Sequence, residues 1–324
     1  MIKAGIIGGS GYTAGELLRL LVHHAEVEID FVYSTTNAGK AIASVHHDLT
    51  GLLNLDFTDE INTSVDVIFL CLGHGNSKKF LLEHKVAEHT VIIDLSNDFR
   101  LEADAQFEGR SFVYGLPELV KEKIAQANAI ANPGCFATAI QLALLPMAEA
   151  GLLPEEIHTT GITGSTGAGV QPSATSHFSW RNNNLSWYKP FDHQHLGEIN
   201  QSLKQTDQKD HHVRFLPYRG NFSRGIFASN YFKFEGEVQK AKEIYKEFYK
   251  DSPFTHVSEN ELHLKQVVNT NLCFVHLHQH DDLLMVTSII DNLLKGASGQ
   301  AVQNMNLIFG IEEKQGLELK ASYF

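Results

Sequence analysis

IKAGIIGGSGYTAG, residues 2–15, runs directly into a leucine-rich segment. An apolar run, a glycine turn and a helix start in this order predict the first strand-to-helix junction of a dinucleotide-binding sheet. Its glycines would let the backbone approach a pyrophosphate closely, and N–H groups at the helix start would stabilise the negative charge. The spacing is Gly-x-x-Gly-x-x-Ala rather than Gly-x-Gly-x-x-Gly, and tight turns also need glycine for backbone reasons alone. The predicted cofactor contacts in this turn are Gly8, Ser10, Gly11, Tyr12 and Thr13.

The same alternation of apolar runs and amphipathic segments continues through the N-terminal part of the chain. These segments lie at 14–22, 27–34, 65–72, 77–83 and 91–95. From Ile157 onward the apolar runs become longer and strand-like, and one charged helical pattern interrupts them at 239–249. The first pattern is typical of a parallel sheet covered by helices, and the second of an α+β domain. We therefore predict an α/β protein in which a Rossmann domain is followed by a second domain.

The end of the second predicted strand bears on the choice between NAD and NADP. It reads YSTTNAGK at 33–40, with no carboxylate to accept a hydrogen bond from the ribose 2′-hydroxyl or to repel a 2′-phosphate. Ser34, Thr35 and Lys40 could instead hold a 2′-phosphate. The alternative is an ordinary solvated loop. The residue types favour NADP as the cofactor.

Cys135 is the residue that indicates chemistry. It follows Asn132-Pro133-Gly134 and precedes the apolar helical run 139–145, so it is expected at a helix N-terminus. There the helix dipole stabilises a thiolate and lowers the thiol pKa from about 8.5. Cys71 and Cys273 lie inside apolar runs and are interpreted as small buried side chains. A thiolate beside a nicotinamide predicts capture of an activated acyl group as a thioester, which hydride then reduces to an aldehyde.

Such a cycle needs a general acid and base, and two histidines and a glutamate are grouped at 193–198. Glu198 follows His195 by three residues and would share its helix face, where it could orient the imidazole. On spacing alone, a solvated surface patch explains His193, His195 and Glu198 equally well.

Composition limits the other possibilities. The 324 residues carry a formal net charge of −12, which disfavours nucleic acid or an anionic membrane as a partner. Three widely spaced cysteines form neither a disulfide framework nor a metal-ligand pattern, so we predict no metal site and a cytoplasmic location. No apolar stretch is long enough to span a bilayer. The polar segment 164–184 is interpreted as an active-site or subunit-contact loop.

Several motifs together resemble the N-acetyl-γ-glutamyl-phosphate reductase family, which is related to aspartate-semialdehyde dehydrogenase. In chain order they are GGSGYT at 8–13, DLSNDFRL at 94–101, YGLPE at 114–118, NPGC at 132–135, HQHLGE at 193–198 and DNLLKGASGQ at 291–300. The resemblance covers essentially the whole chain. It implies NADPH-dependent reduction of N-acetyl-γ-glutamyl phosphate to N-acetylglutamate 5-semialdehyde in arginine biosynthesis.

The resemblance also implies a fold of the glyceraldehyde-3-phosphate dehydrogenase type. Residues 1–145 and 295–324 would form the dinucleotide-binding domain, to which a C-terminal helix returns, and 146–294 the catalytic and oligomerisation domain. The substrate would be a small-molecule acyl phosphate. The polar 164–184 loop and the strand-rich second domain suggest a homodimer or homotetramer.

By motif, Cys135 resembles the family's nucleophile and the two histidines resemble its acid/base region, with His195 favoured. The substrate contacts that we predict are Arg100, for the acyl phosphate, Asn132 and Arg224. An ion pair with Asp98 or Glu102 would explain Arg100 as well, and packing would explain Arg224. Asn292 and Gly296 resemble the helix start near the nicotinamide, although close helix packing also needs such glycines.

Two departures from the family pattern keep alternatives open. Val170-Gln171-Pro172 stands where the family commonly has a basic residue, and Ser34-Thr35-Thr36 replaces Ser-x-Arg. The first departure would fit a different N-acyl group, such as succinyl. An aspartate-semialdehyde dehydrogenase shares the predicted fold, cysteine and cofactor. A third interpretation is an NADP-binding redox sensor in which Cys135 is an oxidisable switch.

Overall fold

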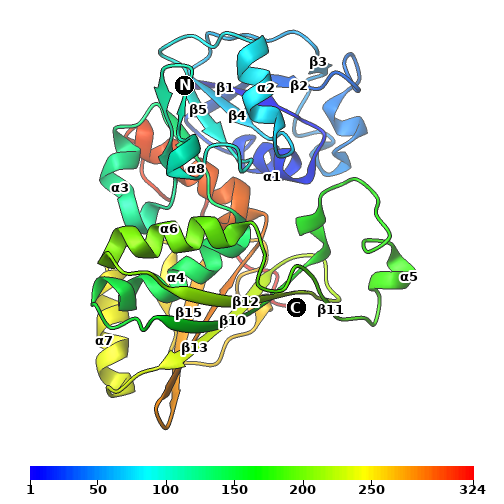
Figure 1. The fold of residues 1–324 in the computed structure, drawn as a ribbon. Coiled ribbons are helices and arrows are strands. Elements are labelled where there is room, and N and C mark those ends of the chain that lie inside the picture. Colours follow the sequence, from blue (N-terminus) through cyan, green and yellow to red (C-terminus); the bar gives the residue numbers. More distant parts are fainter. The chain divides into compact units, whose positions relative to one another are not determined.

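The computed structural model describes all 324 residues, which divide into two compact units (Figure 1). The first unit comprises Met1–Pro133 and Ala297–Glu318. The second unit comprises Gly134–Gly296 and Leu319–Phe324. Each unit has its own sheet and its own helices.

The first unit is built on a seven-stranded sheet in the order β3-β2-β1-β4-β5-β9-β8, and all neighbouring strands are parallel. Its strands are β1 Ile2–Ile7, β2 Val27–Tyr33, β3 Phe57–Thr58, β4 Val67–Leu70, β5 Val91–Asp94, β8 Val113–Tyr114 and β9 Ala129–Ala131. Its helices are α1 Tyr12–Leu21, α2 Asn76–Glu83, α3 Pro117–Ala125 and α8 Gly299–Ile308. A separate hairpin pairs β6 Gln106–Phe107 with β7 Arg110–Ser111.

The strand order fixes where this unit can bind a ligand. β1 pairs with both β2 and β4, so the chain leaves β1 to build the sheet first on one side and then on the other. Doubly wound sheets bind ligands at the carboxyl ends of the strands where this reversal occurs. The glycine turn that follows Ile7 lies at that point. The predicted Rossmann organisation is therefore confirmed.

The C-terminal helix α8 belongs to this unit. It packs against α1 and α3, and its residues from Gly299 to Asn306 are buried. The Ser298 hydroxyl donates to the carbonyl of Thr13 over 2.7 Å. The prediction of a C-terminal helix that returns to the dinucleotide-binding domain is thus confirmed.

The second unit contains a mixed seven-stranded sheet in the order β11-β12-β10-β13-β16-β15-β14. Its strands are β10 Glu156–Thr163, β11 Ser186–Trp187, β12 His212–Arg219, β13 Ile226–Lys233, β14 Thr255–Val257, β15 Cys273–His280 and β16 Leu283–Ile290. Its helices are α4 Cys135–Glu149, α5 Phe178–Arg181, α6 His195–Asp207 and α7 Val238–Phe248. The β10–β12 and β14–β15 pairs are parallel and the others antiparallel.

Helix α4 is the core of the second unit. Every residue from Phe136 to Ala148 is buried, and the helix packs against α6, α7, β13 and β16. The hydroxyls of Tyr245 and Tyr249 donate to carbonyls of α4, each over 2.5 Å. The division between the units therefore lies at Gly134, whereas the sequence placed it after residue 145. A helix that is apolar on all sides has no polar face to indicate which sheet it covers.

The polar segment 164–184 contains a short 3₁₀ turn at Ser165–Ala168 and the four-residue helix α5. Figure 1 shows it as an excursion of the chain between β10 and β11. Helix α5 ends at Arg181, which is buried. No helix in the structure combines the length and apolar character that a bilayer crossing requires.

Candidate active site

Cys135 is the first residue of α4, and the residue before it forms the helix cap. Gly134 has an extended backbone, with φ −70° and ψ 150°, and its carbonyl accepts the first helical hydrogen bond from the Thr138 N–H over 2.8 Å. The Cys135 side chain is partly exposed. The predicted placement of Cys135 at a helix N-terminus is therefore confirmed. The unpaired amides and the dipole at this end of a helix stabilise a thiolate.

Glu198 ties a second helix to this end of α4. One carboxylate oxygen of the buried Glu198 accepts from the Gly134 N–H over 2.9 Å. Its other oxygen lies 3.9 Å from His195 Nε2. Helix α6 begins at His195, so Glu198 lies one turn further on the same helix face, as the spacing predicted. The carboxylate can thus orient His195 and stabilise its imidazolium form.

Gly134 is glycine because His195 packs on it. A Cβ built on Gly134 would lie 2.3 Å from His195 Nε2, closer than any side chain allows. The imidazole therefore lies directly against the backbone that precedes Cys135. The two residues are 61 positions apart by their numbers, 195 − 134. The sequence around Cys135 predicted a helix start here, and this contact explains why the residue before it is glycine.

His193 serves the same cluster in a different way. Its Nδ1 accepts a hydrogen bond from the His195 backbone N–H over 3.2 Å. Aromatic rings of Phe136, Tyr188 and Phe215 meet the His193 ring edge to face at 5.4 to 5.7 Å. Burial, helped by the neighbouring charge of His195, lowers the pKa of His193 to about 3. His193 is therefore neutral at physiological pH and acts as a hydrogen-bond acceptor.

Gly296, which is far from Cys135 in the sequence, packs directly against it. A Cβ at Gly296 would lie 2.8 Å from the Cβ of Cys135 and 3.2 Å from the carbonyl oxygen of Asp291. The glycine is needed because the π-helical turn Leu294–Ser298 passes this close to the start of α4. Its predicted contact with the cofactor stays a prediction.

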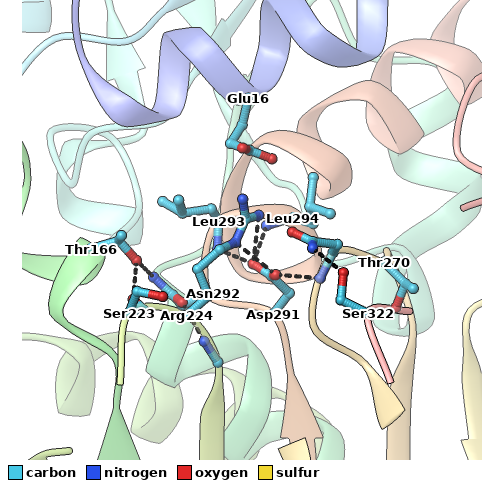
Figure 2. Close-up of polar contacts among 12 residues, drawn as sticks. Glu16, Thr166, Ser223, Arg224, Thr270, Asp291, Asn292, Leu293, Leu294 and Ser322 are labelled. Atoms are coloured by element: carbon cyan, nitrogen blue, oxygen red, sulfur yellow. Dashed lines mark hydrogen bonds and ion pairs between the residues drawn. The ribbon is translucent and has the colours of Figure 1, made fainter. Parts of the chain in front are cut away.

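Arg224 and Asn292 stabilise the loops of the second unit (Figure 2). Arg224 Nε and Nη2 donate to the two oxygens of the fully buried Asp291 over 3.0 and 3.1 Å. The Asn292 amide donates to Thr166 Oγ1 over 3.0 Å and accepts from the Gly225 N–H over 2.7 Å. These contacts give both residues structural roles. Their predicted roles, substrate contact for Arg224 and cofactor contact for Asn292, stay predictions.

Sequence reasoning missed three residues near this cluster, namely Tyr188, Arg219 and Arg181. The Arg219 guanidinium lies over the Tyr188 ring at 4.0 Å. Burial and then the charge of the Cys135 thiolate raise the pKa of Tyr188, while the two arginines oppose that rise. Each of the three lies close in sequence to a segment singled out above for other reasons. Tyr188 precedes the histidines, Arg219 precedes Arg224, and Arg181 lies within the 164–184 segment. Only their spatial grouping distinguishes them.

The glycine turn of the first unit has the features of a pyrophosphate site. Gly8 has a φ of +83°, and a Cβ there would lie 2.7 Å from the Cys71 carbonyl oxygen. The Gly8 and Gly9 N–H groups donate to the Tyr33 carbonyl over 3.1 and 3.0 Å. At Gly11, in contrast, the nearest atom to such a Cβ is 3.9 Å away. No protein atom requires glycine at 11, so the missing side chain leaves room for a ligand at the start of α1.

The end of β2 carries hydroxyls and one lysine, and no carboxylate. Ser34 Oγ and Thr36 Oγ1 lie 3.4 Å apart, and the Asn37 amide donates to both. Lys40 Nζ donates to Asn37 Oδ1 over 3.3 Å. Thr35 and Lys40 are exposed. The donors predicted to hold a ribose 2′-phosphate therefore lie in one short loop.

Arg100 and Asn132 are tied into the first unit. Arg100 Nε donates to the Asn132 carbonyl over 2.8 Å, and its Nη2 donates to the Leu95 carbonyl over 3.0 Å. The Asn132 amide donates to the Ala297 carbonyl and its oxygen accepts from the Asn304 amide, each over 3.1 Å. Both side chains thus hold strand ends together. Their predicted contacts with substrate stay predictions.

The other two cysteines have different surroundings from Cys135. Burial, together with the charge of Asp94, raises the pKa of the Cys71 thiol, so this group stays protonated. Cys273 is fully buried within β15. The interpretation as a small buried side chain fits Cys273, whereas Cys71 is only partly buried.

Comparisons with known proteins identify two domains of the semialdehyde dehydrogenase type in the chain. The family description "Semialdehyde dehydrogenase, NAD binding domain" matches residues 3–127, and "Semialdehyde dehydrogenase, dimerisation domain" matches 135–292. The chain is similar to proteins named N-acetyl-gamma-glutamyl-phosphate reductase. Identity is 61% over 326 residues with that of Christiangramia forsetii and 59% over 325 residues with that of Flavobacterium johnsoniae, with 100% of each chain covered.

Two solved structures share the fold. Aspartate semialdehyde dehydrogenase II from Vibrio cholerae, complexed with ASA, has a TM-score of 0.74 at 17% identity, covering 96% of this chain and 98% of that one. Aspartate semialdehyde dehydrogenase with NADP from Candida albicans has a TM-score of 0.70 at 15% identity, covering 95% and 98%. At these identities the likeness supports the fold alone. The predicted combination of a Rossmann domain and a dimerisation domain is confirmed.

The burial of His193 predicts a pH-dependent stability of the second unit. Its pKa is about 3 when folded and 6.5 as the ordinary value, so below pH 6.5 the unfolded chain binds a proton that the folded chain excludes. The contribution of neutral His193 to the free energy of unfolding is fully present above pH 6.5. As the pH falls toward 3, this contribution declines by at most about 1.4 kcal/mol per pH unit. In His193→Asn the free energy of unfolding should fall less steeply over this range.

Both tryptophans, Trp180 and Trp187, lie in the second unit, so urea unfolding followed by their fluorescence reports on it. His23→Asn changes an exposed imidazole in the other unit and is the matched control, expected to retain the wild-type slope. Equal slopes in the wild type and His193→Asn would contradict the assignment.

Proposed function

This chain belongs to the N-acetyl-gamma-glutamyl-phosphate reductase family, and we propose on that basis that it reduces N-acetyl-γ-glutamyl phosphate to N-acetylglutamate semialdehyde with NADPH, in arginine biosynthesis. The observation that carries the proposal is the position of Cys135. Its sulfur lies at the start of α4, where Glu198 and His195 converge on the preceding residue. A nucleophile, a titratable partner and an orienting carboxylate are the parts that acyl transfer requires.

The Cys135 thiolate attacks the acyl carbon, a C–S bond forms, and the C–O bond to phosphate breaks to release inorganic phosphate. When bound, NADPH would supply the hydride that reduces the thioester carbonyl carbon. The C–S bond then breaks to give the aldehyde and the regenerated thiolate. One acyl phosphate, one NADPH and one proton thus give one aldehyde, one phosphate and one NADP.

His195 is the proposed acid and base of this cycle. Its Nε2 lies against the Gly134 backbone and 3.9 Å from a Glu198 oxygen, so a proton on Nε2 would face a carboxylate. Histidine titrates near neutral pH and suits both removal of the thiol proton and stabilisation of the developing oxyanion. His193 accepts from the His195 N–H and stays neutral, so we assign it to positioning His195.

The residues of the first unit fit NADP. Gly11 leaves open space at the start of α1 for the pyrophosphate. Ser10 precedes this helix cap, and Tyr12 and Thr13 are the first two residues of α1. Ser34, Thr35 and Lys40 would hold the 2′-phosphate, because the end of β2 has donors and no acidic residue to repel it.

We further propose that the protein is a homodimer or homotetramer assembled through the second unit. β13 alternates strictly between buried and partly or fully exposed residues, which leaves one sheet face accessible. On this face the His158 ring stacks on Tyr231 at 5.1 Å, and Tyr231 is 41% exposed. An aromatic strand face of this kind fits a second copy of the chain.

Three free cysteines suit the cytoplasm.

Turnover tests the proposed reaction in reverse. Purified protein with N-acetylglutamate semialdehyde, phosphate and NADP should form NADPH, with NAD a poorer cofactor. Cys135→Ser should lose at least about 1,000-fold in rate, because an alcohol is a weak nucleophile without the thiolate, and should keep NADP binding in a fluorescence titration. Turnover of aspartate semialdehyde instead would favour an aspartate-semialdehyde dehydrogenase. If Cys135→Ser lost a response to oxidation but no catalytic rate, that result would favour a redox sensor.

The molar mass in solution tests the assembly. Light scattering after gel filtration should give two or four times the 36.1 kDa of the chain, and Tyr231→Glu should lower that mass because it places a charge on the contact face. A monomeric wild type at micromolar concentration would contradict the assembly.

A further inference from the structure

Two arginines of the second unit lack an acidic partner. Arg219 lies at the end of β12, its guanidinium stacks on Tyr188 at 4.0 Å, and its Nη1 meets the Trp187 carbonyl at 3.5 Å. Arg181 is 8% exposed and donates to the carbonyls of Gly220 and Thr163 over 2.8 and 3.1 Å. Neither forms an ion pair with any carboxylate of the chain.

This arrangement contrasts with other arginines of the same acidic protein. Three of them form ion pairs with a carboxylate, Arg19 with Glu16, Arg214 with Glu156 and Arg224 with Asp291. Burial and then the charge of Arg219 lower the pKa of Arg181, which places two uncompensated positive charges near one another. A buried charge without a counter-ion is unfavourable unless a ligand supplies it.

The pair lies beside the catalytic cluster. Tyr188, on which Arg219 stacks, meets the His193 ring at 5.7 Å, and its N–H donates to the Pro217 carbonyl on β12 over 3.0 Å. Arg181 is the last residue of α5, within the 164–184 loop. Its guanidinium donates to the carbonyl of Thr163, which is the last residue of β10. One side chain, Tyr188, therefore links the arginines to the histidines.

We propose that Arg219, supported by Arg181, binds a carboxylate of the substrate and thereby sets substrate specificity. The inference rests on the proposed reaction and names a substrate group for it. A guanidinium that stacks by its face keeps its in-plane N–H donors available for the two oxygens of a carboxylate. Two sources supply this chemistry: the α-carboxylate of the glutamyl group, and a terminal carboxylate on the N-acyl group, as in a succinyl substrate.

Phosphate fits this site less well than carboxylate. The phosphate is attached to the carbon that Cys135 attacks, so it must leave from beside the sulfur. Arg219 contacts Tyr188, which is one side chain beyond His193. Several bonds separate the carboxylate of the substrate from its acyl carbon. The carboxylate can therefore reach Arg219 while the acyl carbon lies at Cys135.

The test is the substitution Arg219→Gln, with steady-state kinetics in the reverse direction on three aldehydes. N-acetylglutamate semialdehyde carries the α-carboxylate, N-succinylglutamate semialdehyde carries both carboxylates, and N-acetyl-γ-aminobutyraldehyde carries neither. Loss of one charge-assisted contact should raise KM by about 10- to 100-fold for the aldehyde whose carboxylate is bound, with kcat changed much less. Arg219→Lys should recover part of that loss.

The pattern across the aldehydes identifies the source. A rise for both carboxylate-bearing aldehydes assigns the α-carboxylate, and a rise for the succinyl aldehyde alone assigns the N-acyl carboxylate. The same loss for all three, or a rise in the KM of phosphate instead, would overturn the proposal. Arg214→Gln is the matched control, because Arg214 is an exposed arginine on the same strand, and it should match the wild type.

A binding measurement separates this proposal from the proposed reaction. If the wild type turns over none of the aldehydes, the reaction is contradicted, and calorimetry with N-acetylglutamate and N-succinylglutamate still decides the site. Binding of either acid that is at least about 10-fold weaker in Arg219→Gln supports the carboxylate site. Equal binding by the two proteins, or none by either, overturns it.

Discussion

The hydrogen bond from the Gly134 N–H to the Glu198 carboxylate ties the start of α4 to the start of α6. Three features depend on it. It fixes the backbone that presents Cys135, it places a negative charge one turn from His195, and it holds the two helices at a distance that lets the imidazole pack on Gly134. The candidate active site is therefore built on a contact between the N-terminal ends of two helices.

This geometry gives different surroundings to two histidines that spacing alone could not distinguish, although the family motif favoured His195. His193 is enclosed by three aromatic rings and accepts from a backbone N–H, so it cannot change its charge near neutral pH. His195 lies next to the one carboxylate of the cluster and against the cysteine-bearing backbone. The proposed roles follow from these surroundings: proton transfer for His195 and positioning of His195 for His193.

Local signals were sufficient for part of this picture. The helix start at Cys135, the three-residue spacing of His195 and Glu198, and the glycine turn at 8–11 follow from short sequence windows, and the structure has each of them. The alternation of strands and helices likewise predicted the parallel sheet. These features depend on neighbours along the chain, which is why sequence alone could indicate them.

Features that depend on distant residues could not be predicted in this way. Gly134 has to be glycine because the His195 side chain packs against it, and Gly296 has to be glycine because Cys135 packs against it. Arg219 is distinguished from Arg224 only by its partner, an aromatic ring for the first and Asp291 for the second. The helix that carries Cys135 joins the second unit because its partners lie there, and its own pattern is apolar apart from Thr138, Gln141 and Glu149.

The central claim is that the start of α4 makes Cys135 a reactive thiolate, and its alkylation rate tests this most directly. The rate of iodoacetamide modification of Cys135, identified by mass spectrometry of its peptide, should rise with pH through an apparent pKa below the free-thiol value of about 8.5. The positive end of the helix and a protonated His195 would both contribute to that shift. An apparent pKa of about 9 or above, in the range of an unactivated thiol, would contradict the account.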